Sequence, residues 1–173
     1  MKPLIPFALT SGLILASAMP AVAETSAAES GPYLGAKIGR LDIDAGYEVD
    51  DPAMTGFVLG YNFGGWAIEL ERNSGEGSLT EPFGGSSYDF DVDTTAAYFA
   101  YRTEGEVYFK VKAGWLEEEI AFDYENENIN ESDTGFSAGI GAGFRGEIFR
   151  IELEVTRIEE DAILLGAGLI AQF

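Results

Sequence analysis

Apolar and polar residues alternate along eight stretches of this chain, a period-2 pattern typical of β-strands with one apolar face. The pattern is clearest near the end of the chain, where Phe149, Ile151, Leu153 and Val155 alternate with residues that are charged or polar. We expect strands at Tyr33–Leu41, Met54–Tyr61, Trp66–Arg72, Phe90–Arg102, Val107–Leu116, Gly135–Phe144, Ile148–Arg157 and Ala162–Phe173.

Two kinds of connection alternate strictly between these strands. Three are tight, polar and contain the glycine that short hairpins favour: Asn62–Gly65, Thr103–Glu106 and Arg145–Glu147. Four are acidic and contain no lysine or arginine: Asp42–Ala53, Asn73–Asp93, Glu117–Asp133 and Glu159–Asp161. Four connections on one side and three on the other predict eight antiparallel strands with both chain ends on the same side.

The apolar face of each strand carries no charge at mid-strand, as a surface in contact with lipid requires. Strands can cross a membrane only when their sheet closes, because lipid satisfies no backbone hydrogen bond. We therefore predict an all-β fold, an eight-stranded antiparallel up-and-down transmembrane β-barrel. One strand is ambiguous: Tyr98 and Ala100 lie on one face, but Phe99 and Tyr101 lie on the other. A β-bulge would reconcile them.

Acidic and basic residues occur in nearly equal number on the opposite faces of the strands. This predicted lumenal charge network comprises Lys37, Glu69, Glu71, Lys110, Lys112, Arg145, Arg150, Glu152 and Glu154. The interior of an eight-stranded barrel is only wide enough for side chains, so these charges should pair and fill it. A conducting pore would need more strands or a lining of one sign. The sequence therefore predicts a charge-filled, plugged lumen.

The amino-terminal segment has the features of an export signal. A basic start, an apolar run from Leu4 to Ala18 and the small residues Ala21-Val22-Ala23 indicate cleavage after residue 23. A transmembrane helix is the alternative, but the run is short for a bilayer and contains Pro6. We expect residues 1–23 to be a signal peptide, 24–32 a flexible periplasmic leader and 33–173 the barrel domain.

Composition excludes several classes of function. The 173 residues include 30 acidic and 10 basic ones, a net charge of −20 that argues against nucleic acid as a partner. The absence of cysteine excludes disulfides, and the absence of histidine removes the usual activation of a serine nucleophile. The pairs Glu69/Glu71 and Glu152/Glu154 face basic residues and read as structural. We predict neither an enzyme nor a cofactor.

No dedicated metal site is predicted. Asp89–Asp93 resembles the start of a calcium loop, but Thr94 and Ala100 stand where that loop needs glycine and glutamate. The acidic Glu125–Glu131 is better read as a solvated extension of a hairpin. Crowded acidic connections should still bind divalent cations weakly to relieve their own repulsion.

Three arginines lie where strands meet acidic connections. Arg40, Arg72 and Arg157 have the parity of the lipid-facing side. A guanidinium at that level would meet the phosphate groups of lipopolysaccharide. Snorkelling or a salt bridge to adjacent acids is the equally weighted alternative.

Short motifs in the expected order give the chain a resemblance to a known family. Tyr33–Gly39 (YLGAKIG), Gly60–Phe63 (GYNF), Tyr108–Gly114 (YFKVKAG) and the terminal Phe173 resemble the small eight-stranded outer-membrane barrels of the OmpA/OmpX-like group. The resemblance extends from Tyr33 to Phe173. It implies the outer membrane of a Gram-negative cell and insertion by the outer-membrane assembly machinery, which would recognise Leu169, Ala171 and Phe173. Because the sequence stops at Phe173, we expect it to lack the peptidoglycan-binding domain of full-length OmpA.

The expected function is that of a monomeric integral outer-membrane protein with a structural or surface-interaction role. Its expected partners are outer-membrane lipid and lipopolysaccharide. A narrow passive porin-like channel is one alternative, and an adhesin acting through residues 117–133 is another. A soluble ligand-binding barrel would need the reverse polarity, with polar residues outside and an apolar cavity inside.

Overall fold

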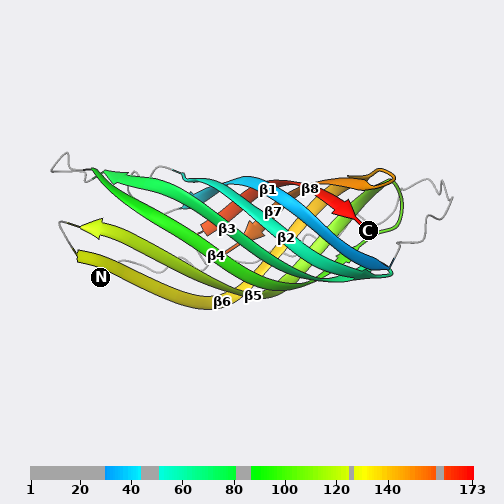
Figure 1. Cartoon of the computed structure of the whole chain (residues 1–173), viewed down its shortest axis with the longest axis horizontal. Helices are drawn as coiled ribbons and strands as arrows, with labels where there is room; N and C mark the ends of the chain where they lie inside the picture. Colours follow the sequence, from blue (N-terminus) through cyan, green and yellow to red (C-terminus); the bar gives the residue numbers. More distant parts are fainter. Residues whose placement is uncertain (1–29, 44–50, 81–86, 125–126, 159–161) are drawn as a thin grey trace, which may run out of the picture.

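The computed structural model describes residues 30–43, 51–80, 87–124, 127–158 and 162–173. They form eight antiparallel strands: β1 (Gly31–Ile43), β2 (Ala53–Phe63), β3 (Trp66–Thr80), β4 (Ser87–Arg102), β5 (Val107–Tyr124), β6 (Glu127–Arg145), β7 (Phe149–Arg157) and β8 (Ala162–Gln172). Each strand pairs with its neighbours in sequence, and β1 pairs with β8 to close the barrel (Figure 1). The predicted fold class is confirmed.

The strands begin and end in two distinct zones. The tight turns after β2, β4 and β6 lie at one end of the barrel, here called the turn end. Gly64 and Gly105 have φ values of 78° and 111° in two of these turns, a conformation that favours glycine. The third turn is held by a 2.8 Å hydrogen bond from the Gly146 amide to the Phe149 carbonyl. The opposite end is called the hairpin end.

The hairpin end is much longer than the sequence pattern indicates. β3 continues to Thr80 and β5 to Tyr124, so that most of the predicted acidic connections at 73–93 and 117–133 is strand. β5 and β6 stay in register as far as Tyr124 opposite Glu127. The prediction ended these strands where their outer face became charged. Such a change marks the end of the apolar band, but backbone pairing continues beyond it. Figure 1 shows β3 to β6 reaching past the other strands.

Strand β4 needs no bulge. Its pairing with β3 and with β5 runs without interruption, so its side chains alternate strictly between the two faces. Tyr98 and Ala100 are buried inside the barrel, whereas Phe99 and Tyr101 are exposed outside. The predicted bulge is therefore wrong, and the aromatic residues on the two faces of β4 belong to different layers.

An apolar band surrounds the outside of the barrel. Exposed outward side chains include Leu34, Phe57, Ile68, Val111 and Leu153, one from each of five strands. Aromatic rings gather toward the turn end of the band, where Trp66 stacks 5.0 Å from Phe99 and lies 4.7 Å from Tyr101. Such aromatic girdles are typical of the interface between membrane and water. No helix of the described residues is long and apolar enough to cross a membrane.

Some predictions concern residues that the structure does not describe. The expected signal peptide at 1–23, most of the leader at 24–32, and parts of the acidic connections lie outside the described residues. Gly31 and Pro32, assigned to the leader, are already in β1. The signal peptide and the leader remain predictions.

Candidate functional site: a charge network inside the barrel

Most of the charged side chains inside the barrel come from every second strand. Lys37 comes from β1, Glu69 and Glu71 from β3, Lys110 and Lys112 from β5, and Glu152 and Glu154 from β7, and all seven are buried. Glycines of two intervening strands give these side chains room. Gly139 and Gly141 of β6 lie against Lys112 and Glu154, and Gly168 of β8 lies against Lys37. Long charged side chains thus cross the narrow lumen because their neighbours occupy almost none of it.

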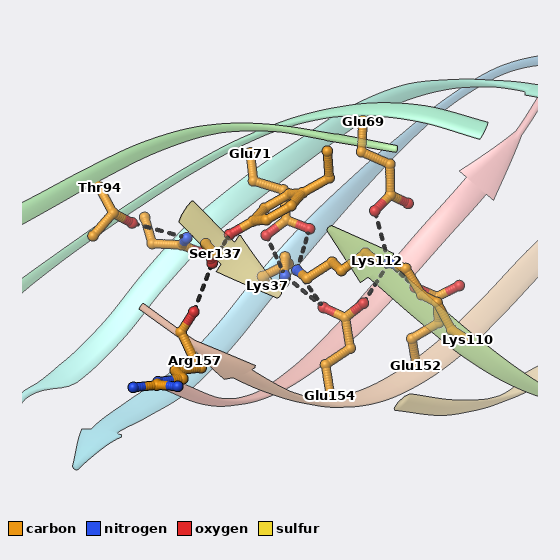
Figure 2. Close-up of polar contacts among 12 residues, drawn as sticks. Lys37, Glu69, Glu71, Thr94, Lys110, Lys112, Ser137, Glu152, Glu154 and Arg157 are labelled. Carbon is orange, nitrogen blue, oxygen red and sulfur yellow. Dashed lines mark hydrogen bonds and ion pairs between the residues drawn. The ribbon is translucent and has the colours of Figure 1, made fainter. Parts of the chain in front are cut away.

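The half of the network nearer the hairpin end is a square of two lysines and two glutamates. Lys37 Nζ lies 2.7 Å from both Glu71 Oε2 and Glu154 Oε2. Lys112 Nζ lies 2.7 Å from Glu71 Oε1 and 3.2 Å from Glu154 Oε2. Figure 2 shows both ammonium groups between the two carboxylates. Each charge has two opposite charges beside it, the arrangement that buried ion pairs need to offset desolvation.

The half nearer the turn end is built around Lys110 and Arg102. Lys110 Nζ contacts Glu154, lies 2.9 Å from Glu69 Oε2 and 3.0 Å from Glu152 Oε2. Arg102 Nε donates to Glu152 Oε1 at 2.7 Å, and Arg102 also contacts Glu69. Lys110 joins the two halves, since Glu154 contacts lysines in both. The network is continuous across the lumen.

Two tyrosines complete the hydrogen bonding of the glutamates. The Tyr33 hydroxyl donates to Glu69 Oε1 at 2.6 Å, and the Tyr108 hydroxyl donates to Glu152 Oε1 at 2.6 Å. The ring of Tyr33 lies over Gly60 and the ring of Tyr108 over Gly143, where any side chain would collide with them. These glycines therefore make room for the rings.

Arg102 was missed by the sequence analysis, although it is 2 % exposed and central to the network. It is the last residue of β4, the strand whose facing was ambiguous. The parity of Tyr98 and Ala100 is the signal that places Arg102 inside. Tyr33 and Tyr108 were also missed. Each is an even number of residues from an inward lysine and so shares its face, but only charged residues were assigned to the network.

Arg145 and Arg150 were expected in the network, but the structure places both outside its ion pairs. Arg150 is buried, and its guanidinium lies 4.7 Å from the centre of the Tyr33 ring. Its Nε and one Nη have no hydrogen-bond partner among the described residues. Arg145 is half-buried, stacks 5.0 Å from the Tyr108 ring and donates to the Gly105 carbonyl. Both arginines lie near the turn end, where a tight turn joins β6 to β7 and Arg145 is paired with Arg150.

An apolar cluster lies inside the barrel toward the hairpin end. Its buried members are Leu41, Met54, Phe90, Val92, Ala96, Tyr98, Leu116, Ile158, Ala162 and Leu164. Tyr98 connects this cluster to the network below, because its ring lies 4.3 Å from Lys112 Nζ and its hydroxyl is 2.8 Å from Ser137 Oγ. Glu118 of β5, two residues beyond Leu116, is also buried at this end, so a carboxylate accompanies the apolar side chains there.

The glutamates are arranged for ion pairing and not for holding a metal. Glu69, Glu71 and Glu154 bring carboxylate oxygens within 4.8 Å of one another, a spacing that could suit a cation. Lys37 and Lys110 nitrogens already lie between these oxygens. An ammonium group thus supplies the positive charge at that point.

The outward arginines lie at the hairpin-end border of the apolar band. The Arg40 side chain is 67 % exposed and pairs with Asp51 at 2.8 Å; that of Arg72 is 55 % exposed and lies 3.8 Å from Asp93. Arg157 is exposed on the same surface, and its backbone carbonyl accepts a hydrogen bond from Ser137. The predicted parity of all three agrees with the structure, while their contact with lipopolysaccharide stays a prediction.

The predicted assembly signal lies on the outer surface of the last strand. Leu169 and Phe173 are exposed, and Ala171 is half-buried. The Phe173 amide donates to the Pro32 carbonyl at 3.1 Å, which extends the pairing of β8 with β1 by one residue. Recognition of these residues by assembly machinery stays a prediction.

Comparison with known proteins agrees with this architecture. The family model of the outer membrane protein beta-barrel domain matches residues 9–159. No curated protein sequence matches the chain significantly.

Three solved structures illustrate the likeness. Neisserial surface protein A aligns with a TM-score of 0.63 and 11% identity, over 83% of this chain and 97% of that one. Ail, the attachment invasion locus protein of Yersinia pestis, solved with the heparin analogue sucrose octasulfate, aligns at 0.55 and 19% identity, over 83% and 96%. The N-terminal barrel of Pseudomonas aeruginosa OprF aligns at 0.54 and 15% identity, over 84% and 100%. At these identities the likeness shows the fold alone.

Substitution should lower the stability of the barrel at Arg102 but not at Arg150. Arg102→Met leaves the Glu69 and Glu152 carboxylates without a guanidinium, and we expect a loss of about 3–5 kcal/mol in unfolding free energy. Arg150→Met removes a buried charge that forms no direct ion pair with a carboxylate of the described residues, so stability should be unchanged or higher. Urea unfolding in lipid vesicles measures both. Equal losses in the two variants would contradict the assignment of Arg102 to the network and Arg150 outside it.

Proposed function

The chain belongs to the outer membrane protein beta-barrel domain family, and from this premise we propose that it is a non-conducting barrel that presents an acidic β-sheet at the cell surface. The outer membrane is its location. In this class of barrel the short turns face the periplasm and the long connections face outward. The hairpin end would therefore be extracellular.

The continuous charge network is the observation that carries the non-conducting assignment. Lys110 contacts glutamates from both β3 and β7, and so do Lys37 and Lys112. An ion crossing the lumen would have to separate these pairs inside a barrel only wide enough for side chains. The buried side chains of the apolar cluster would add a second obstacle in series with the network.

The extension of β3 to β6 supports a surface-interaction role. Its outer face carries Asp91, Asp93, Glu117 and Glu119 on neighbouring strands, in exposed or half-buried positions. A protein with only a structural role within the membrane would need no strands beyond the apolar band. A sheet on a closed, rigid barrel is a suitable platform for binding, because little order is lost when a partner docks.

The acidic sign of this sheet narrows the choice of partner. The Ail structure contains a heparin analogue, a sulfated anion. A surface with a net charge of −20 for the whole chain repels such anions and attracts cationic groups. We therefore propose basic protein surfaces as the partners, in preference to sulfated polysaccharides.

A narrow passive channel is the competing function, and conductance separates the two. The wild-type protein should give no current steps in planar bilayers. Replacing Lys37, Lys112, Glu71 and Glu154 together by serine keeps the net charge but empties the square of ion pairs, and should open a small conductance.

The matched control for that variant is the outer pair Arg72→Ser and Asp93→Ser, which is also charge-balanced but lies outside the lumen. It should stay closed. Regular steps from the wild-type protein would overturn the non-conducting assignment, whatever the quadruple variant does.

The outward arginines generate a separate test of lipid contact. Replacing Arg40, Arg72 and Arg157 together by alanine should lower both the amount of co-purified lipopolysaccharide and the thermal midpoint, because guanidinium groups bind phosphate in two-point fashion. Arg145→Ala, at the turn end, is the single-site control. If the triple variant retains both values, the proposed contact of these arginines with lipopolysaccharide is wrong.

A further inference from the structure

The two arginines outside the ion pairs of the network start directly opposite each other at the turn end. Arg145 of β6 and Arg150 of β7 are register partners, and both have the parity of the lumenal face. Like charges directly opposite each other destabilise a pair of strands. The acidic residues of the turns are exposed and form no ion pair with either arginine among the described residues; they are Glu104, Glu106 and Glu147.

Positive charge exceeds negative charge in this part of the lumen. The network contains four buried glutamates, whereas half-buried Arg145 adds to five buried bases, which are Lys37, Arg102, Lys110, Lys112 and Arg150. Glu118 is the other carboxylate that the structure describes as buried, but it lies toward the hairpin end of β5. Arg145 and Arg150 are therefore the two positive charges that the glutamates of the network leave unbalanced.

Arg150 does not share a carboxylate of the network. Glu152 lies two residues away on the same face of β7, but its oxygens already have donors. The Tyr108 hydroxyl and Arg102 Nε donate to its Oε1 at 2.6 and 2.7 Å, and Lys110 Nζ donates to its Oε2 at 3.0 Å. Nε and one Nη of Arg150 have no hydrogen-bond partner among the described residues. A buried donor without a partner is costly, so it indicates a ligand that completes its hydrogen bonding.

Two tyrosine rings hold the guanidinium groups. The guanidinium of Arg150 lies 4.7 Å from the centre of the Tyr33 ring, and that of Arg145 lies 5.0 Å from the centre of the Tyr108 ring. A guanidinium held over a ring keeps its N–H groups in its own plane, where they can donate to two oxygens of one anion. The rings thus orient both arginines in advance of binding.

We propose that Arg145 and Arg150 bind a small soluble oxyanion with two negative charges, such as inorganic phosphate, at the turn-end mouth of the lumen. Two guanidinium groups match its charge and its paired oxygens. The ligand is small because Arg150 is only 2 % exposed. It is soluble because both arginines face the lumen, so that the barrel wall separates them from lipid headgroups. The site is independent of the surface-interaction function, which concerns the opposite end of the barrel.

Isothermal titration calorimetry with inorganic phosphate tests the site. The folded protein is held in non-ionic detergent at a pH where phosphate is mostly divalent, and chloride at the same ionic strength is the blank. We expect saturable binding of one phosphate per chain. Glycerol 3-phosphate distinguishes free from esterified phosphate and should bind more weakly, because its glycerol group does not fit beside an enclosed arginine. Tighter binding of the ester would contradict an enclosed site.

Three variants locate the bound anion. Arg150→Met should weaken phosphate binding at least about tenfold, since charged hydrogen bonds are lost. Arg150→Lys keeps the charge but loses the planar fork, and should weaken binding about three- to tenfold. The control is Ser132→Glu at the exposed hairpin end, which lowers the net charge by the same amount as Arg150→Met. It should change binding less than about twofold, because charges so far apart are screened.

Unfolding in urea gives an independent readout. A ligand that binds only the folded state raises its stability. Phosphate should therefore raise the urea midpoint of the wild-type protein relative to chloride, and should leave that of Arg150→Met unchanged. The site is wrong if phosphate gives the wild-type protein no saturable heat, or if Arg150→Met binds phosphate as tightly as the wild type. Either result leaves the surface-interaction function standing.

Discussion

The pairing of charges inside the barrel is the constraint on which the rest of the interior depends. An eight-stranded barrel leaves room for side chains but little for water, so a charge that enters the lumen must meet an opposite charge there. Lys110 illustrates this: it contacts three glutamates and is buried. The long side chains from β1, β3, β5 and β7 can meet because small residues such as Gly139, Gly141 and Gly168 lie beside them.

The same constraint explains the layers at the two ends of the network. Tyr33 and Tyr108 donate to the same carboxylate oxygens that Arg102 contacts, and their rings need the bare backbone of Gly60 and Gly143. At the opposite end, apolar side chains cover the square of ion pairs. Arg150 is the exception. It is a buried cation outside the ion pairs of the network, and its guanidinium lies against the Tyr33 ring.

The outer face of one continuous sheet contacts two solvents, lipid and water. Outward side chains are apolar as far as Trp115 on β5 and become acidic from Glu117 onward. Backbone pairing continues across this change, because hydrogen bonds between strands are satisfied equally in lipid and in water. Strands β3 to β6 therefore continue as a sheet beyond the end of β7. Among the described residues, 127–137 of β6 pair with β5 but not with β7.

Much of this architecture could be predicted from local patterns. Period-2 alternation located all eight strands, and glycine-centred turns located the three tight connections. Prediction failed where the decisive information was not local. Arg102 sits at a strand end whose facing depends on β3 and β5, and the length of β5 and β6 depends on their mutual pairing. Arg145 and Arg150 have inward parity, but parity does not say which carboxylates a side chain can reach.

The sequence by itself determined the number of strands, their order, the face of each that meets lipid and the acidic character of one end. These follow from residue spacing, because side chains alternate on any strand. Only the tertiary structure decided which charges pair, which glycines lie beneath tyrosine rings and how far each strand pairs with its neighbours. Those properties depend on strand register and shear, which bring together residues such as Lys37 and Glu154 from distant parts of the chain.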